Sequence, residues 1–133
     1  MKNNTIKKGT EIDISIDSLA YGGNGISKYN GIVVFTKNVI PGQIVKAKII
    51  KNKKTYLEAI PLEIIKESKY KIEEKCSHFN DCGGCKIQDL EYSQQTKQKF
   101  NQTKEALEHI GKIKISSINQ IIKSPKIFEY RNK

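Results

Sequence analysis

Apolar and polar residues alternate in the first third of the chain, and this pattern limits the fold more than any other feature. Within residues 11–19, three isoleucines alternate with charged or hydroxyl residues. Successive side chains of a strand point to opposite faces, so such a run is typical of a half-buried strand. Further short strand-like runs occupy residues 31–36, 43–50 and 56–60. Short strands joined by glycine and proline turns, with no helical period, predict a mainly β fold, a small antiparallel barrel that closes its own edges.

A glycine cluster, "YGGNG", covers residues 21–25. A phosphate-binding loop needs glycines between a strand and a helix, so that the helix N-terminus meets the phosphate. Here a strand-like segment follows, and the cluster is therefore interpreted as a tight turn. We expect Tyr21 to be exposed beside it, where its ring is available to stack on a base.

The chain is strongly basic, with 24 Lys plus Arg against 14 Asp plus Glu and a net charge of +10. Residues 1–67 and 68–133 each contribute +5, so the charge is not confined to a tail. A polyanion is the natural partner of such a surface. Five lysines surround one expected hairpin beside Tyr56, namely Lys46, Lys48, Lys51, Lys53 and Lys54. Basic groups next to an aromatic ring suit single-stranded RNA, and a solvated hairpin tip is the alternative.

All three cysteines lie in the stretch "CSHFNDCGGC", as Cys76, Cys82 and Cys85. An odd number of thiols argues against a disulfide framework. Glycines between the second and third cysteine let the chain bend, so the three sulfurs can meet at one metal centre. Zinc would need a fourth ligand, for which His78 is the nearby candidate. An iron–sulfur cluster normally takes four cysteines.

The motif order in residues 8–66 resembles the TRAM domain, an OB-like RNA-binding barrel. The resemblance rests on the turn at Leu19–Gly25, on Gly31 followed by "VVF", and on "IPGQIV" at residues 40–45. It implies an RNA-binding role, and TRAM domains usually accompany RNA-modifying enzymes.

The cysteine stretch resembles the iron–sulfur segment of bacterial RNA uracil-5-methyltransferases that carry a TRAM domain. The matching residues are Cys76, Cys82, Gly83, Gly84, Cys85, Gln88 and Tyr92. The resemblance implies a [4Fe–4S] cluster held by the three cysteines, with a fourth ligand beyond this chain. It also implies S-adenosylmethionine on a further domain, where a cysteine adds to C6 of uracil, C5 is methylated and a carboxylate removes the C5 proton.

Residues 67–133 are expected to form a truncated iron–sulfur and helical region that leads into that methyltransferase domain. Asp89 or Ser93 is expected to cap a helix that stops at Gly111. Its apolar stripe is expected at Phe100, Thr103, Leu107 and Ile110. Residues 127–130 are typical of the start of a strand.

The sequence therefore predicts the RNA-binding portion of an RNA (uracil-5-)-methyltransferase, with 23S rRNA as the expected substrate. The chain itself offers no catalytic residue. A tRNA-directed enzyme, a stand-alone RNA-binding module with a Cys₃His zinc site and a thiol redox sensor are the alternatives. No signal peptide or membrane span is apparent, so we expect a cytoplasmic location and no membrane partner. We also expect a monomer with no DNA partner.

Overall fold

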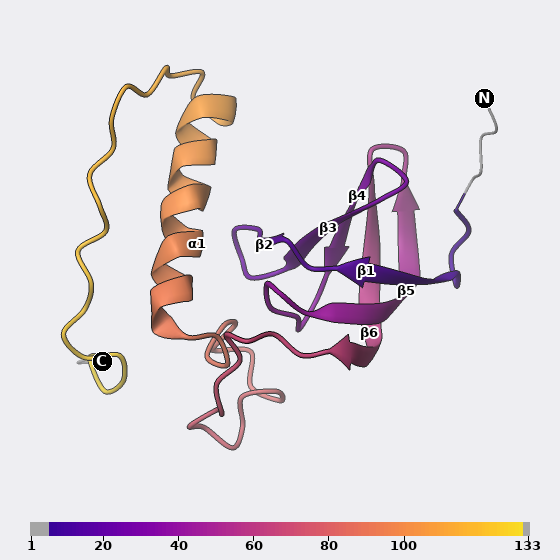
Figure 1. The fold of residues 1–133 in the computed structure, drawn as a ribbon, viewed down its shortest axis with the longest axis horizontal. Coiled ribbons are helices and arrows are strands. Elements are labelled where there is room, and N and C mark those ends of the chain that lie inside the picture. Colours follow the sequence, from indigo (N-terminus) through magenta and orange to yellow (C-terminus); the bar gives the residue numbers. More distant parts are fainter. Residues whose placement is uncertain (1–5, 132–133) are drawn as a thin grey trace. The chain divides into compact units, whose positions relative to one another are not determined.

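A computed structural model of the chain describes residues 6–131 and contains six strands and one long helix (Figure 1). The helix α1 (Tyr92–Glu105) continues into a π-helical turn at Ala106–Ile110. The described chain divides into two compact units after Leu90. The strands, all in the first unit, are β1 (Glu11–Ser15), β2 (Ser18–Leu19), β3 (Gly25–Tyr29), β4 (Ile32–Thr36), β5 (Ile44–Lys53) and β6 (Tyr56–Lys66). The predicted mainly β fold is confirmed.

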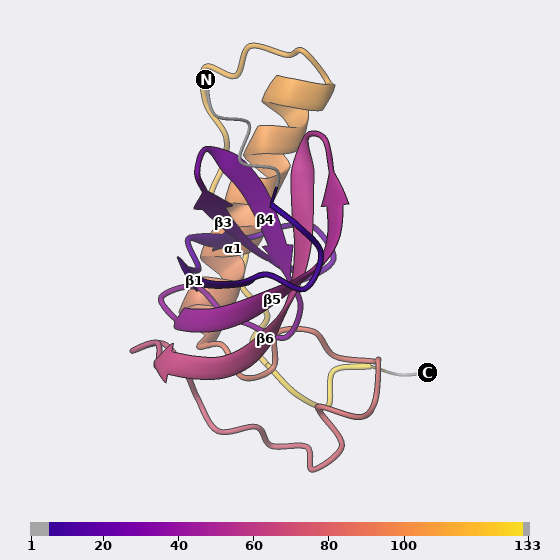
Figure 2. The same ribbon diagram turned by 90° about the vertical axis from the view of Figure 1, so that its right-hand side faces the viewer.

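The strands form one sheet in the order β1-β5-β6-β4-β3-β2. Four of its five pairings are antiparallel, and β4 pairs with β6 in parallel. The long hairpin β5–β6 changes register three times, and such irregularities bend a strand and increase its twist. Figure 2 shows the sheet curling, and β1 comes back into contact with β3. The sheet is therefore barrel-like, with its two end regions brought together.

Alternation in the sequence becomes burial in the sheet. Ile12, Ile14 and Ile16 are at most 4% exposed, while the residues between them are exposed. On β5, Val45, Ala47 and Ile49 are buried, while Lys46 is half-buried and Lys48 is exposed, as predicted. The rest of this core comprises Val34, Val39, Val45, Ala47, Ile49, Leu57 and Ala59. The opposite face of the sheet, called the outer face below, is free to carry binding residues.

A second, smaller core joins the cysteine segment to the barrel. Leu19 and Ile40 from the barrel pack with Leu90, and Tyr70 and Ile87 cover them. Tyr70 precedes the cysteines at residues 76–85, and Ile87 and Leu90 follow them, so both ends of this cysteine segment contact the barrel. The segment after β6 therefore folds back on the barrel, and the first compact unit extends to Leu90.

Buried hydrogen bonds fix the point where the chain leaves β6. The Ser68 hydroxyl donates to the carbonyl oxygen of Pro41 at 2.6 Å. The Gln43 side-chain amide donates to Glu67 at 2.7 Å, and its oxygen accepts from the Ile40 N–H at 2.8 Å. Ile40, Pro41, Gln43 and Ser68 are buried, so losing the partner of one of their bonds leaves a desolvated polar group. The direction of the chain into the cysteine segment is thus set by the barrel.

The glycine cluster forms a turn that leads into β3, as predicted, and Tyr21 is 95% exposed. The structure adds a packing role. Gly23 has φ +93°, and a Cβ there would lie 2.8 Å from Cβ of Lys86. Glycine at this position therefore allows the cysteine segment to approach the turn closely.

The helical unit differs from the expectation in its N-cap and in its apolar stripe. The N-cap residue is Glu91, without a side-chain capping bond, so the predicted caps are wrong. Asp89 pairs with Lys71 instead, and the Ser93 hydroxyl donates to Glu91. In the predicted stripe only Phe100 is half-buried, whereas Thr103, Leu107 and Ile110 are exposed. Gly111 ends the helical segment, as predicted.

The strand expected at residues 127–130 is not formed, and the described part of the chain after Gly111 contains no strand. A strand needs a neighbour to accept its backbone hydrogen bonds. The sequence pattern of residues 127–130 suits a strand, but no neighbouring strand pairs with them in the described part of the chain.

We predict that Gly25→Ala destabilises the barrel by about 1–3 kcal/mol through overpacking. Gly25 is buried on β3, and a Cβ there would collide with Val39 and lie 3.0 Å from Ile16 Cγ2. Urea denaturation followed by far-ultraviolet circular dichroism measures the effect. Gly83→Ala is the control, because nothing lies within 4 Å of its Cβ position. Equal stability of the two variants would contradict the packing.

Candidate functional site

The cysteine segment is a loop whose two ends are tied together. An isolated bridge pairs Lys71 with Leu90, and the Ile72 N–H donates to the Asp89 carbonyl oxygen at 2.9 Å. Between these ends the loop runs from Cys76 to Cys85. The three cysteines therefore lie on one loop that leaves the barrel and returns to it.

An ion-pair cluster reinforces the base of this loop. Lys71 Nζ lies 2.9 Å from Glu74 Oε1 and 3.1 Å from Asp89 Oδ2. Burial lowers the pKa of Lys71, but its hydrogen bonds to Glu74 and Asp89 outweigh burial and leave the pKa raised. The hydrogen bond from Lys71 is the main reason why the pKa of Glu74 is lowered. Lys71 and Glu74 are therefore both charged at neutral pH.

Inside the loop, short-range hydrogen bonds shape the backbone around the cysteines. The Cys76 N–H donates to the Gln88 side-chain oxygen at 2.9 Å, which connects the first cysteine to the outgoing arm. The His78 carbonyl oxygen accepts from the N–H groups of Asp81 and Cys82 at 3.1 and 2.7 Å. The positioning role of Gln88 was not predicted, because only the folded loop brings it to the first cysteine.

The three thiols are free and exposed. Among residues 6–131 no three metal-ligating side chains converge on one point, so the structure places the cysteines on one loop without gathering their sulfurs. The His78 ring lies 3.4 Å from the Ser77 hydroxyl. The donor set still fits an iron–sulfur centre, because three accessible thiolates with no competing disulfide are what such a centre requires. Both the cluster and the zinc alternative remain predictions.

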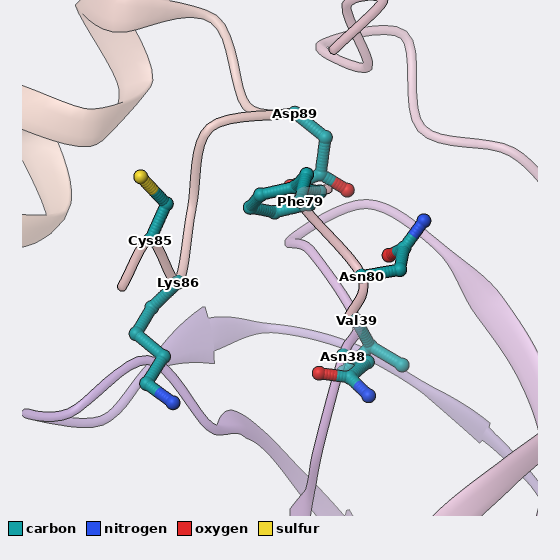
Figure 3. Close-up of a pocket in the computed structure, with 7 residues that line it drawn as sticks. All are labelled: Asn38, Val39, Phe79, Asn80, Cys85, Lys86 and Asp89. Carbon is teal, nitrogen blue, oxygen red and sulfur yellow. The ribbon is translucent and has the colours of Figure 1, made fainter. Parts of the chain in front are cut away.

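One side of the loop borders a small pocket (Figure 3). The β4–β5 connection supplies Asn38 and Val39 to it. Four of its residues come from the two arms of the loop and Asp89 from its base, and in Figure 3 the Cys85 thiol points away from the asparagine amides. The loop residues that line the pocket are Phe79, Asn80, Cys85, Lys86 and Asp89.

The lysines that the sequence grouped together lie in two different environments. On β5, Lys46 lies between Asp13 of β1 and Glu63 of β6, and Lys48 lies opposite Glu11. Opposite charges on neighbouring strands attract each other and reduce the positive potential.

Near the hairpin tip the surroundings are more positive. Lys51 forms a 3.0 Å ion pair with Glu58, while Lys53 lies opposite Tyr56 and Lys54 is in the turn. The Tyr56 ring contacts Phe35, a residue that we did not single out from the sequence. No periodicity in the sequence indicated this contact, because residues 32–35 form a continuous apolar run; the pairing of β4 with β6 brings the two rings together.

Residues 6–62 match the family model of the TRAM domain. Together with the curled six-stranded sheet, this match makes the barrel a TRAM domain, a class of RNA-binding fold. No described helix is long and apolar enough to cross a membrane. A solution structure of a conserved protein from Methanococcus maripaludis is 30% identical, covers 47% of this chain and 90% of its own, and has a TM-score of 0.43.

The similarity to curated proteins covers nearly the whole chain. An "uncharacterized RNA methyltransferase" of Aquifex aeolicus is 38% identical over 124 residues, 93% of this chain and 29% of that protein. A protein of Clostridium acetobutylicum with the same description is 38% identical over 130 residues, which are 96% of this chain and 28% of that protein. A third, in Listeria monocytogenes, is 35% identical over 100% of this chain and 29% of its own. The chain is thus similar over nearly its whole length to proteins named RNA methyltransferases, and it spans less than a third of their length.

We predict that Lys71→Met destabilises the first compact unit by up to about 1 kcal/mol near neutral pH. The lowered pKa of Glu74 means that its contribution is present above the ordinary glutamate pKa and is lost as pH falls through the folded value. The raised pKa of Lys71 means that its contribution is lost only as pH rises above about 10.4. The difference between wild type and variant should therefore shrink below about pH 4.

Urea midpoints measured across this pH range test the prediction. Lys37→Met is the control, because Lys37 is exposed and no ion pair is found for it among the described residues. A difference that stayed constant down to about pH 3 would show that Lys71 acts through packing of its stem rather than through its charge.

Proposed function

We propose that this chain is the RNA-binding portion of an S-adenosylmethionine-dependent RNA (uracil-5-)-methyltransferase that acts on 23S rRNA in the cytoplasm. The observation that carries the proposal is the similarity, at 35–38% identity over nearly the whole chain, to proteins named RNA methyltransferases. The TRAM domain and the net charge of +10 support an RNA partner. Methyl transfer and its cofactor belong to protein outside this chain.

In this function the barrel holds RNA while the catalytic domain reaches the target base. A uracil buried in paired RNA must leave its stack before its C5 and C6 are accessible. Sequence-independent contacts to phosphates keep the RNA bound during that step. The outward-facing lysines of the barrel supply such contacts, and a monomer is sufficient for the role.

We also propose that Cys76, Cys82 and Cys85 supply three ligands of a [4Fe–4S] cluster. A cluster bound there would link this loop to the part of the protein that supplies the fourth ligand. The residues of the chain position the thiols. Gln88 holds the Cys76 backbone at 2.9 Å, and Lys71 closes the base of the loop.

Two alternatives follow from the same residues. A tRNA-directed enzyme would use the same RNA-binding barrel. A stand-alone RNA-binding module would use Cys76, His78, Cys82 and Cys85 to bind zinc. His78 is exposed close to the cysteines in the chain, so its ring is accessible as the fourth zinc ligand of this second alternative.

Deletion of the gene tests the substrate. We expect mass spectrometry of 23S rRNA to lose 5-methyluridine at one or more positions, and a plasmid copy of the gene to restore it. Loss from tRNA alone would replace the ribosomal proposal by the tRNA one. Unchanged 5-methyluridine in both RNA classes would contradict the methyltransferase proposal.

Metal analysis of the complete protein, purified without oxygen, tests the cluster. We expect about four iron and four sulfide per chain, loss of both in Cys82→Ser, and retention of both in His78→Ala. The imidazole variant is the control because it removes a zinc ligand but no thiol. Zinc without iron, lost in His78→Ala, would establish the alternative site instead.

A further inference from the structure

Two rows of side chains cross the outer face of β3, β4, β6 and β5. The buried partners between the rows, such as Val34 and Leu57, point into the core. The rows themselves therefore point outward. The first row is Lys28, Val33, Tyr56 and Lys53, and the second is Ile26, Phe35, Glu58 and Lys51. These eight residues are called the aromatic face below.

The centre of the aromatic face is an edge-to-face pair of rings. The Phe35 and Tyr56 centroids lie 5.5 Å apart, with an interplanar angle of 76°. Both rings are half-buried, and so are their apolar neighbours Ile26 and Val33. A solvated face of an antiparallel sheet usually carries polar residues at such positions. Half-exposed aromatic and apolar side chains grouped on a sheet are typical of a binding surface.

The charge around these rings is positive. Lys28 and Lys53 close the two ends of the first row, and no acidic residue lies in that row. The single acid of the second row, Glu58, is paired with Lys51 at 3.0 Å. Lys46, by contrast, lies between Asp13 and Glu63. The first row spans three strand spacings, about 14 Å, which is long enough for adjacent nucleotides to lie across it.

We propose that the aromatic face binds single-stranded RNA, with bases stacked on Phe35 and Tyr56 and phosphates contacted by Lys28 and Lys53. This inference rests on the proposed RNA-binding function and identifies its contact surface. Rings on a sheet stack only on bases that are free of a duplex, and they accept any base because every base has a π-face. Lys46 and Lys48, which lie opposite acidic residues on neighbouring strands, are not part of this contact surface.

Tyrosine variants test the stacking. Binding of the chain to a single-stranded RNA oligonucleotide is compared with binding to an abasic strand of the same length. We expect Tyr56→Leu to weaken binding to the normal strand about tenfold, with little effect on the abasic strand. Tyr56→Phe keeps the π-face and should bind within about twofold of wild type. Phe35→Leu provides a second variant, and unfolding midpoints confirm that each variant is folded.

Lysine pairs test the location. In Lys28→Ala/Lys53→Ala, the slope of log affinity against log salt should fall by about 1.4, or about 0.7 for each single-strand phosphate that is no longer neutralised. Lys46→Ala/Lys48→Ala removes the same charge from the acid-flanked rows and is the matched control. Its slope should stay close to the wild-type slope.

The outcomes separate this inference from the proposed function. If wild-type chain binds no RNA, or binds it without salt dependence, both fail. If wild type binds but Tyr56→Leu loses affinity equally for normal and abasic strands, the stacking proposal fails while RNA binding stands. A larger slope change in Lys46→Ala/Lys48→Ala than in the first pair would place the RNA on β1 and β5, and would overturn the aromatic face.

Discussion

The pairing of β5 with β6 is the interaction on which the rest of the structure depends. These strands, of ten and eleven residues, are the longest in the sheet, and they join β1 on one side to β4 on the other. A shift of one residue would turn every core side chain of either strand outward. The hairpin thus fixes which residues form the core, such as Val45 and Leu57, and which remain outside. The parallel pairing of β6 with β4 then aligns Tyr56 with Val33, and the ring of Tyr56 contacts the ring of Phe35.

Local alternation accounts for how much of the fold the sequence predicted. The predicted runs at residues 11–19, 31–36, 43–50 and 56–60 each overlap an observed strand, because alternation and turn residues need no knowledge of a partner strand; β5 and β6 continue beyond those runs, to Lys53 and Lys66. The parallel pairing of β4 with β6 and the contact of Gly23 with Lys86 depend on segments far apart in the chain. The helix cap failed for the same reason. Asp89 has the chemistry of a cap, but Lys71, 18 residues away, binds its carboxylate.

The electrostatic surroundings of the lysines in the candidate site could not be predicted from the sequence either. Five lysines near one hairpin appear equivalent in the sequence, and the sheet register separates them. Lys46 and Lys48 have acids on neighbouring strands, whereas Lys53 has an aromatic ring opposite. The effect of a charge on a distant phosphate depends on the sum of nearby charges. Cross-strand neighbours, which no single sequence window contains, therefore decide which lysines are effective.

The cysteine loop has an ordered base and an exposed tip. This combination suits the proposed cluster, which takes three ligands from this loop and a fourth from outside this chain. Lys71 and Asp89 hold the ends of the loop, and the small core around Leu90 attaches it to the barrel. The thiols at the tip stay exposed and apart. Because the base of the loop is already held, the rearrangement that the proposed cluster needs can be confined to residues 76–85. Because ordering about ten residues costs conformational entropy that metal–thiolate bonds must offset, a base that is already ordered reduces that cost. In the proposed function the TRAM domain would thus support the loop while the cluster binds, in addition to contacting RNA.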